Sequence, residues 1–384
     1  MKLLQIFLII LVLSFYGLIS YFIGLRGYKA FKIMPFFNPK VYWILFAIVV
    51  VSIFIVRILE NHAEGRLYNL IEVISFYWMA TIVYALLILL LYDIIGLLLR
   101  IGFANAHSYW IKPEFTVFRA IAAIILILGL FIYGNINSKN IKVVEYNLNI
   151  NKKVEGINKL TIVMASDFHL GNIINDKRLK HFVETANGLK PDIVLLAGDI
   201  IDENPKVYDK LNMKNIFNRL NTEYGVYACL GNHEYFRGNT DDIVKSLVDG
   251  NIKVLRDEVV SIEDKFYIVG REDKTYDRLV GKRKSIEQLV DKLDKSKPII
   301  LLDHQPIDIE NAIKSGVDIE VSGHTHKGQF FPIDLFTKRL FVKDYGHYTK
   351  GNYNLFVSSG YGTWGPPIRI GNSPEIVLIR VFFK

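Results

Sequence analysis

Four apolar stretches in the first third of the chain restrict its fold more than any other feature. A bilayer has a hydrocarbon core about 30 Å thick, and a helix needs about 20 apolar residues to cross it. Backbone groups cannot stay unpaired in lipid, so such stretches cross as helices. We therefore predict a four-helix transmembrane region over residues 1–134, with spans at Leu3–Gly24, Val41–Val56, Val73–Leu99 and Val117–Tyr133.

Two of these spans admit a second interpretation. A cleaved signal peptide is the alternative for the first, but its apolar run is long and no A-x-A-like site follows, which favours a retained helix. The third is too short for two spans, so we expect one span to Tyr92 followed by an interfacial turn. Asp93 is then expected at the membrane interface, and the alternative is a polar contact between helices or a site residue.

Lysine and arginine residues favour one orientation of these helices. Four spans place the N-terminus and the C-terminal part on the same side, and cytoplasmic loops are enriched in Lys and Arg. The loops after spans one and three carry the excess, so we expect the C-terminal domain outside the cytoplasm, in a multi-pass integral membrane protein. They hold Arg26, Lys29, Lys32, Lys40, Arg100, Lys112 and Arg119, against Lys2, Arg57, Arg66, Lys139 and Lys142 on the other side.

Composition excludes several classes of protein. Apolar residues make up 51% of the 384 residues and the net charge is +8. No basic cluster is interleaved with aromatic residues, so nucleic-acid binding is not expected. The single cysteine, Cys229, excludes an intrachain disulfide and a cysteine-rich zinc site. The sequence carries no signal of oligomeric state.

Residues 135–157 are predicted to form a connector with one strand, and residues 158–384 a folded domain. Short β-branched runs alternate there with helical patterns, which predicts an α/β fold with a largely central sheet. Strands are expected at Ile141–Ile150, Leu160–Ala165, Asp192–Ala197, Val226–Leu230, Pro298–Leu302 and Ile319–Ser322. Helices are expected at Asp176–Asn187, Asp209–Leu220, Asp241–Val248 and Ser285–Leu293.

Polar blocks follow five of these strands. They are Asp167-Phe168-His169, Gly198-Asp199, Gly231-Asn232-His233-Glu234, His304 and Gly323-His324-Thr325-His326. Ligands of open α/β sheets bind beyond the carboxyl ends of the strands, so we expect the blocks to form one site. Carboxylate and imidazole together suit Mn, Fe or Zn, whereas an all-oxygen set would indicate Mg or Ca.

In order, the blocks read D-x-H, G-D, G-N-H-[DE], H and G-H-x-H, and the chain closely resembles the calcineurin-like metallophosphoesterases over residues 158–384. The resemblance implies an α/β/β/α sandwich. The glycine-rich tail Ser359–Arg369 is similar to that of the membrane-associated bacterial phosphohydrolase branch. A Ser/Thr protein phosphatase is disfavoured, because Ile200-Ile201-Asp202 stands where Asp-Arg-Gly is expected and Leu230 stands where Arg is expected.

The resemblance also implies roles for the site residues. A first divalent metal ion would be held by Asp167, His169 and His326, a second by Asn232, His304 and His324, and Asp199 would bridge the two. It implies hydrolysis of a phosphoester by hydroxide that the two ions generate between them. His233 would protonate the leaving oxygen, and the alternative for it is a structural histidine. Asp303 and Glu234 are candidates for orienting imidazoles.

Three residues near the C-terminus are candidates for substrate contacts. Arg369 is a candidate phosphate-binding residue, because a guanidinium holds two oxygens at once, and the alternative is an exposed loop arginine. Trp364 and Tyr361 are candidates for contacting an acyl chain or sugar, or for packing within the loop. The predicted function is a membrane-anchored phosphomonoesterase or phosphodiesterase, with lipid-linked and envelope phosphoesters among its candidate substrates. The alternative is a catalytically silent membrane receptor or scaffold that binds phosphate.

Overall fold

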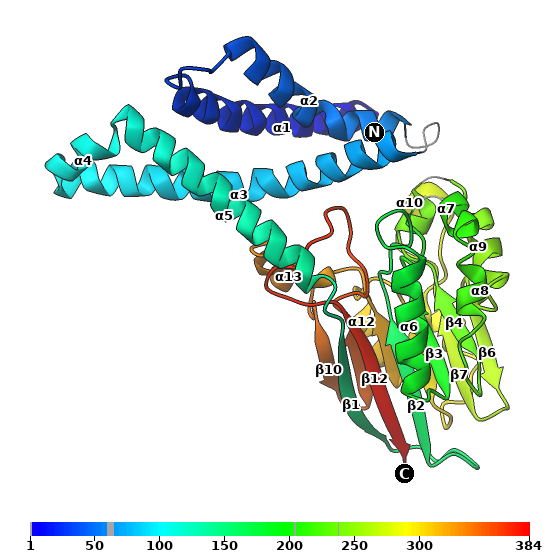
Figure 1. Cartoon of the computed structure of the whole chain (residues 1–384). Coiled ribbons are helices and arrows are strands. Elements are labelled where there is room, and N and C mark those ends of the chain that lie inside the picture. The colour runs from blue at the N-terminus through cyan, green and yellow to red at the C-terminus, as the bar shows by residue number, and fades with distance from the viewer. Residues whose placement is uncertain (1, 60–64, 203–204, 237) are drawn as a thin grey trace. The chain divides into compact units, whose positions relative to one another are not determined.

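The computed structural model describes residues 2–59, 65–202, 205–236 and 238–384, and it divides into two compact units. The first unit is Met1–Ile132 and the second is Tyr133–Lys384 (Figure 1). Because the fifth helix crosses this boundary, its last turn belongs to the second unit.

The first unit is entirely helical in its described residues. Four of its helices are long and apolar enough to cross a membrane, with mean hydropathies of 2.5–2.7 over their most apolar windows. The helices are α1 (Lys2–Phe31), α2 (Pro39–Leu59), α3 (Arg66–Gly102), the short α4 (Ala104–Trp110) and α5 (Pro113–Asn137).

Helix α3 differs from the sequence prediction. It continues to Gly102, so the interfacial turn expected after Tyr92 is wrong. Asp93, in the second half of α3, forms an ion pair with Arg26 of α1, which is the polar contact between helices that the sequence analysis gave as the alternative. With that charge paired and helix-forming leucines and isoleucines following it, nothing in the local sequence ends the helix there.

The second unit contains two six-stranded sheets. In the order in which they pair, the strands of the first are β1 (Lys142–Ile150), β12 (Glu375–Phe383), β2 (Lys159–Ala165), β3 (Ile193–Ala197), β4 (Val226–Cys229) and β5 (Lys253–Val254). Those of the second are β10 (Gly346–Lys350), β11 (Tyr353–Val357), β9 (Ile319–Ser322), β8 (Ile299–Leu302), β7 (Phe266–Gly270) and β6 (Glu258–Ile262). Strand β1, which the sequence analysis assigned to a connector, pairs with β12 along its whole length and is part of the first sheet.

The two sheets pack face to face with helices outside each of them. Along β2, Leu160, Ile162 and Met164 face the core between the sheets, while Val163 and Ala165 face the helices, because strand side chains alternate. This arrangement is the α/β/β/α sandwich that the family resemblance implied. The single central sheet expected from the strand pattern alone is wrong, because the second sheet includes antiparallel edge strands that the pattern did not reveal.

The helices of the second unit are mostly short. The first sheet is covered by α6 (Asp176–Gly188), α7 (Pro205–Lys210), α8 (Lys214–Phe217) and α9 (Thr240–Val248). The others are α10 (Tyr276–Leu279), α11 (Ile286–Val290), α12 (Ile309–Lys314) and α13 (Asp334–Leu340). The single helix expected at Asp209–Leu220 is broken, because Asn212 takes a left-handed conformation with φ of 52° that no α-helix continues through.

Candidate active site

All five polar blocks of the sequence lie beyond the carboxyl ends of strands. They follow β2, β3 and β4 of the first sheet and β8 and β9 of the second. Each of these sets of strands is parallel, so its carboxyl ends share one edge, and the two edges meet. The site is therefore assembled from both sheets.

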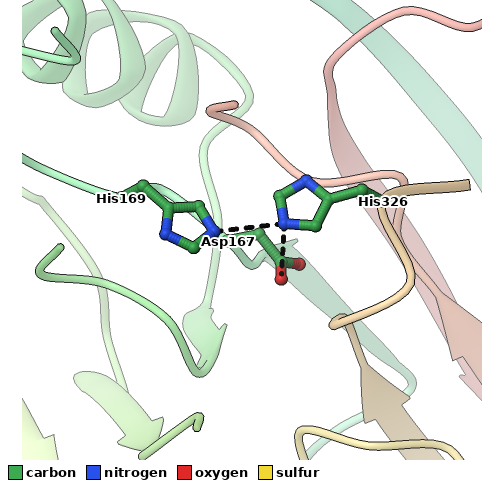
Figure 2. A group of neighbouring side chains, drawn as sticks. All are labelled: Asp167, His169 and His326. Atoms are coloured by element: carbon green, nitrogen blue, oxygen red, sulfur yellow. Dashed lines mark hydrogen bonds and ion pairs between the residues drawn. The ribbon is translucent and has the colours of Figure 1, made fainter. Parts of the chain in front are cut away.

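The first group of side chains is Asp167, His169 and His326 (Figure 2). The Nε2 atoms of the two histidines are 3.1 Å apart, and His326 Nε2 is 3.3 Å from Asp167 Oδ1. All three side chains are buried. Their ligand atoms converge on one point from segments more than 150 residues apart, as the ligands of a metal ion do.

The second group is centred on Asp199 and contains His304, His324 and Asn232. His304 Nε2 lies 3.3 Å from Asp199 Oδ2, and Asn232 Oδ1 lies 3.2 Å from His304 Nε2 and 2.7 Å from His324 Nδ1. Asp199 Oδ2 is also 3.9 Å from His169 Nε2 of the first group. The structure therefore brings all seven predicted ligands together, and Asp199 lies between the two groups.

The protonation states of His326 and Asp199 suit a bound cation. Burial opposes protonation of His304, but Asp199 outweighs it and raises the pKa of that imidazole, whose extra proton a metal ion would have to displace. The Ala197 carbonyl accepts from His304 Nδ1 at 2.7 Å, which directs Nε2 toward Asp199 and Asn232. Burial, His169 and Arg369 hold the pKa of His326 well below its ordinary value, which favours the neutral imidazole that a metal requires. Burial opposes ionisation of Asp199, but His304 and His233 outweigh it and keep the pKa of that carboxyl low. The residues present thus fit divalent metal ions.

The backbone that carries these ligands is held in an uncommon conformation. Asp167, His169, Asp199, His324 and His326 all have φ between 48° and 70°, the left-handed region that costs a non-glycine residue about 1–3 kcal/mol. Such conformations persist only where the surrounding structure enforces them, and they cluster at functional sites.

Two glycines of the sequence blocks allow the ligand loops to approach closely. A Cβ atom on Gly231 would overlap Asp199, and one on Gly323 would overlap Asp167. The close backbone approach to the site that glycine permits is thus what these two positions require. In the structure, any larger residue at either position would displace a carboxylate of the candidate metal site.

Glu234 holds two of the ligand loops together. Its carboxylate accepts from the backbone N–H groups of Asp199, Ile200, Ile201 and Gly231 at 2.6–3.1 Å. It contacts no imidazole in these bonds, so the orienting role expected for it from the sequence is replaced by a role in fixing the loop backbones.

Replacing Glu234 with glutamine is expected to destabilise the folded chain. The amide turns one acceptor oxygen into a donor that faces two backbone N–H groups, and leaving buried donors unpaired costs about 1–3 kcal/mol. Thermal unfolding of the detergent-solubilised chain measures the loss. The matched control is Glu263→Gln, whose exposed carboxylate contacts Lys265. Equal unfolding temperatures for the two variants would contradict this role.

Asp202 is a site residue that the sequence analysis did not name as one. Its Oδ1 lies 3.1 Å from His233 Nδ1 and 3.4 Å from His169 Nδ1. Desolvation opposes ionisation of this carboxyl, but the hydrogen bonds to His169 and His233 outweigh it and lower its pKa. The available signal was its position three residues after Asp199, at the end of the same loop.

Asp303 and Arg369 differ from their predicted roles. The Asp303 carboxylate pairs with Arg271 at 3.0 Å and Arg283 at 3.4 Å, and neither bond orients an imidazole. Arg369 is fully buried, and its guanidinium donates to the carbonyls of His326 at 3.0 Å and Gly362 at 2.6 Å. Arg369 therefore fixes the backbone of the loop that carries His326, a candidate ligand. It is not the phosphate-binding residue that the sequence suggested.

The two aromatic residues that were candidates for substrate contact lie in different environments. Tyr361 is fully buried, packs against Phe168 and donates its hydroxyl to the Arg178 carbonyl at 2.7 Å, so it is a core residue. Trp364 is partly exposed and lines a cavity of about 340 Å³. That cavity also contains Asp199, Asn232, His233, His324 and His326.

Comparison with known proteins identifies the class of the second unit. Residues 160–328 match the calcineurin-like phosphoesterase family. An uncharacterised metallophosphoesterase of Aquifex aeolicus is 34% identical over 65% of this chain and 95% of its own length. One of Campylobacter jejuni is 30% identical over 98% of this chain and 99% of its own. A Danio rerio protein named as a transmembrane protein with a metallophosphoesterase domain is 29% identical over 68% of this chain and 62% of its own.

The fold and the convergent carboxylates and imidazoles define a metal-binding phosphoesterase domain. The chain belongs to the calcineurin-like phosphoesterase family, and its relatives are named metallophosphoesterases. Together with the four long apolar helices, the transmembrane relative supports association of the chain with a membrane.

Proposed function

We propose that this protein is a membrane-anchored phosphoesterase that hydrolyses a phosphomonoester or phosphodiester at a site for two divalent metal ions. One observation carries the proposal: Asp199 is shared by two groups of side chains that could hold a metal ion, one with His169 and His233 and the other with His304 and His324. A carboxylate in that position would let two cations share one site despite their mutual repulsion. Mn, Fe and Zn fit the mixed carboxylate and imidazole ligands.

The chemistry divides between the ions and the protein. Bound ions supply an activated water nucleophile and neutralise charge on the phosphoryl oxygens. The chain's residues orient the ligands, because Asp167 accepts the His324 backbone N–H at 2.9 Å and Asp199 accepts that of His233, also at 2.9 Å. The carboxylates that bind metal thus also fix the loops that carry the neighbouring histidines.

His233 is the proposed general acid. It lines the same cavity as the ligands, and the Asp202 carboxylate holds its Nδ1. A carboxylate at Nδ1 stabilises the protonated imidazole, which then delivers its proton from Nε2 to the leaving oxygen. Asp202 is therefore proposed to position His233.

The proposed location of the catalytic unit is outside the cytoplasm, as the excess of Lys and Arg in loops one and three favours. A Glu263→Cys variant tests it, because this side chain is exposed, whereas the native Cys229 is buried. Labelling of intact cells by an impermeant maleimide is expected. Labelling only after lysis would reverse the assignment.

Turnover of soluble chromogenic esters tests the proposed activity. The full chain in detergent is expected to hydrolyse bis(p-nitrophenyl) phosphate or p-nitrophenyl phosphate, to lose that activity on chelation and to regain it with Mn, Fe or Zn. The ratio of the two rates assigns the diester or monoester class. A folded, metal-loaded chain that turns over neither ester would favour the catalytically silent receptor instead.

A further inference from the structure

An exposed apolar surface lies along one side of the candidate active site. Residues of α13 and of the segments beside it expose side chains that a water-facing surface seldom gathers in one place. We call this surface the α13 patch, and its members are Phe331 (49% exposed), Leu335 (45%), Phe336 (61%), Leu340 (77%), Val342 (72%) and Trp364 (45%).

The α13 patch is continuous with the site cavity. Ile333 and Thr337, on the inner face of the same segment, line the cavity together with Trp364 and His233. Phe341, which follows α13, packs edge-on against the candidate ligand His324, with ring centroids 6.0 Å apart. The apolar surface is therefore continuous with the wall of the cavity and forms part of its rim.

Hydrogen bonds tie this rim to the place where the chain leaves its fourth apolar helix. Asn137, in the last turn of α5, donates to the carbonyls of Arg369 at 3.0 Å and Asn372 at 2.6 Å. Asn372 in turn donates to the Lys327 carbonyl at 3.2 Å, and the Phe331 N–H donates to the Ile370 carbonyl at 2.9 Å. All these residues belong to the second unit. The last turn of α5 and the segment that carries the α13 patch thus belong to the same unit and are connected by hydrogen bonds.

The charges around the α13 patch also suit a membrane surface. Arg339 and Lys343 lie in the same short segment as Leu340 and Val342, whereas the neighbouring Lys338 is paired with Asp334 at 2.9 Å. Basic side chains flanking exposed aromatic and aliphatic ones are typical of segments that lie in the lipid interface, where they meet anionic headgroups.

We propose that the α13 patch inserts into the interfacial layer of the bilayer that holds the apolar helices. The cavity then opens at the membrane surface, and its substrate is an amphiphilic phosphoester whose apolar tail stays in the lipid. This substrate class rests on the proposed phosphoesterase function, whereas the insertion itself does not. A second copy of the chain or a protein partner on the same surface is the competing occupant.

Insertion of the α13 patch into the bilayer is tested by fluorescence quenching of a dye attached to the full chain. Single cysteines at Phe336→Cys or Leu340→Cys carry an environment-sensitive dye, in nanodiscs of phosphatidylcholine with brominated acyl chains. Interfacial segments sit about 5–10 Å into the headgroup and acyl boundary, so dye fluorescence is expected to fall roughly twofold or more. The control is Glu263→Cys, on the β6–β7 turn at the opposite ends of the strands, where no quenching is expected.

The insertion would be overturned if, at each of the three positions, the dye fluoresced equally in brominated and in ordinary lipid. Disulfide cross-linking between Phe336→Cys chains in place of quenching would assign the α13 patch to a second copy. Either result concerns the surface alone, so it leaves the proposed activity on soluble esters standing.

The substrate class is tested with two esters that share a leaving group. Hexadecyl p-nitrophenyl phosphate partitions into the nanodisc, and ethyl p-nitrophenyl phosphate stays in water. The long ester is expected to have a kcat/KM about tenfold or more higher, and a Phe336→Ser/Leu340→Ser variant is expected to lose that preference without losing turnover of the short ester. An unchanged preference in the variant would overturn the substrate class. A chain that hydrolyses neither of these diesters nor the monoester p-nitrophenyl phosphate fails the proposed function, while the quenching result still decides the insertion.

Discussion

Replacing Asp199 with asparagine is expected to lower phosphoester turnover by about a thousandfold or more. The carboxylate lies between the two groups of candidate ligands, with His304 Nε2 at 3.3 Å and His169 Nε2 at 3.9 Å from its Oδ2. An amide keeps the shape but removes the charge that lets two cations share the site. The measurement is kcat/KM for the better of the two chromogenic esters at saturating metal.

The control for this variant is Asp249→Asn, which neutralises a surface carboxylate paired with Lys214 at 3.4 Å. It is expected to behave as the unsubstituted chain. Because His233 donates its backbone N–H to Asp199, the variant's fold is checked by thermal unfolding. A folded Asp199→Asn chain with turnover within tenfold of the unsubstituted chain would contradict the bridging role.

Replacing His233 with alanine is expected to lower turnover by about 10²–10⁴-fold for esters whose leaving oxygen needs a proton. The loss is expected to shrink for a nitrophenyl ester, because nitrophenolate leaves without protonation. Metal content is expected to stay unchanged, since the proposed role of His233 is proton transfer and not metal binding. Rates for an alkyl ester and a nitrophenyl ester, compared in the same preparation, measure the difference.

Two further variants sharpen the assignment of the general acid. Asp202→Asn removes the carboxylate 3.1 Å from His233 Nδ1 and is expected to show the same dependence on leaving group with a smaller loss. His181→Ala, on the exposed face of α6, is expected to have no effect. An equal loss for both esters in His233→Ala, accompanied by loss of metal, would instead make His233 a ligand.

The site could be predicted from the sequence to a large extent because metal ligands occupy short fixed blocks. Each block follows a buried apolar strand, and the carboxyl ends of parallel strands converge, so the pattern alone indicated that the blocks form one site. The family resemblance then supplied the seven candidate ligands. Asp202 and Arg369 act through contacts between loops. Apart from the position of Asp202 three residues after Asp199, nothing in the local sequence distinguishes them from ordinary loop residues, and the burial of Arg369 shows a different role from the predicted one.

The fold was harder to predict beyond its central strands. Strands such as β3 are fully buried apolar runs and are easily recognised, whereas β6 and β10 are partly exposed edge strands with mixed sequences. The second sheet therefore did not emerge from the pattern itself, and the family resemblance supplied it. The extent of α3 was missed because Asp93, the charge that interrupts the predicted span, is paired with Arg26, a partner 67 residues away in the sequence.

Metal content tests the proposed two-ion site most directly. The purified full chain, loaded with Mn, Fe or Zn and freed of excess ion, is measured by plasma mass spectrometry alongside Asp199→Asn. Two ions per unsubstituted chain are expected, with turnover that rises with occupancy of the second ion. Full turnover with a single ion bound, or no retained ion in a folded chain, would contradict the two-ion site.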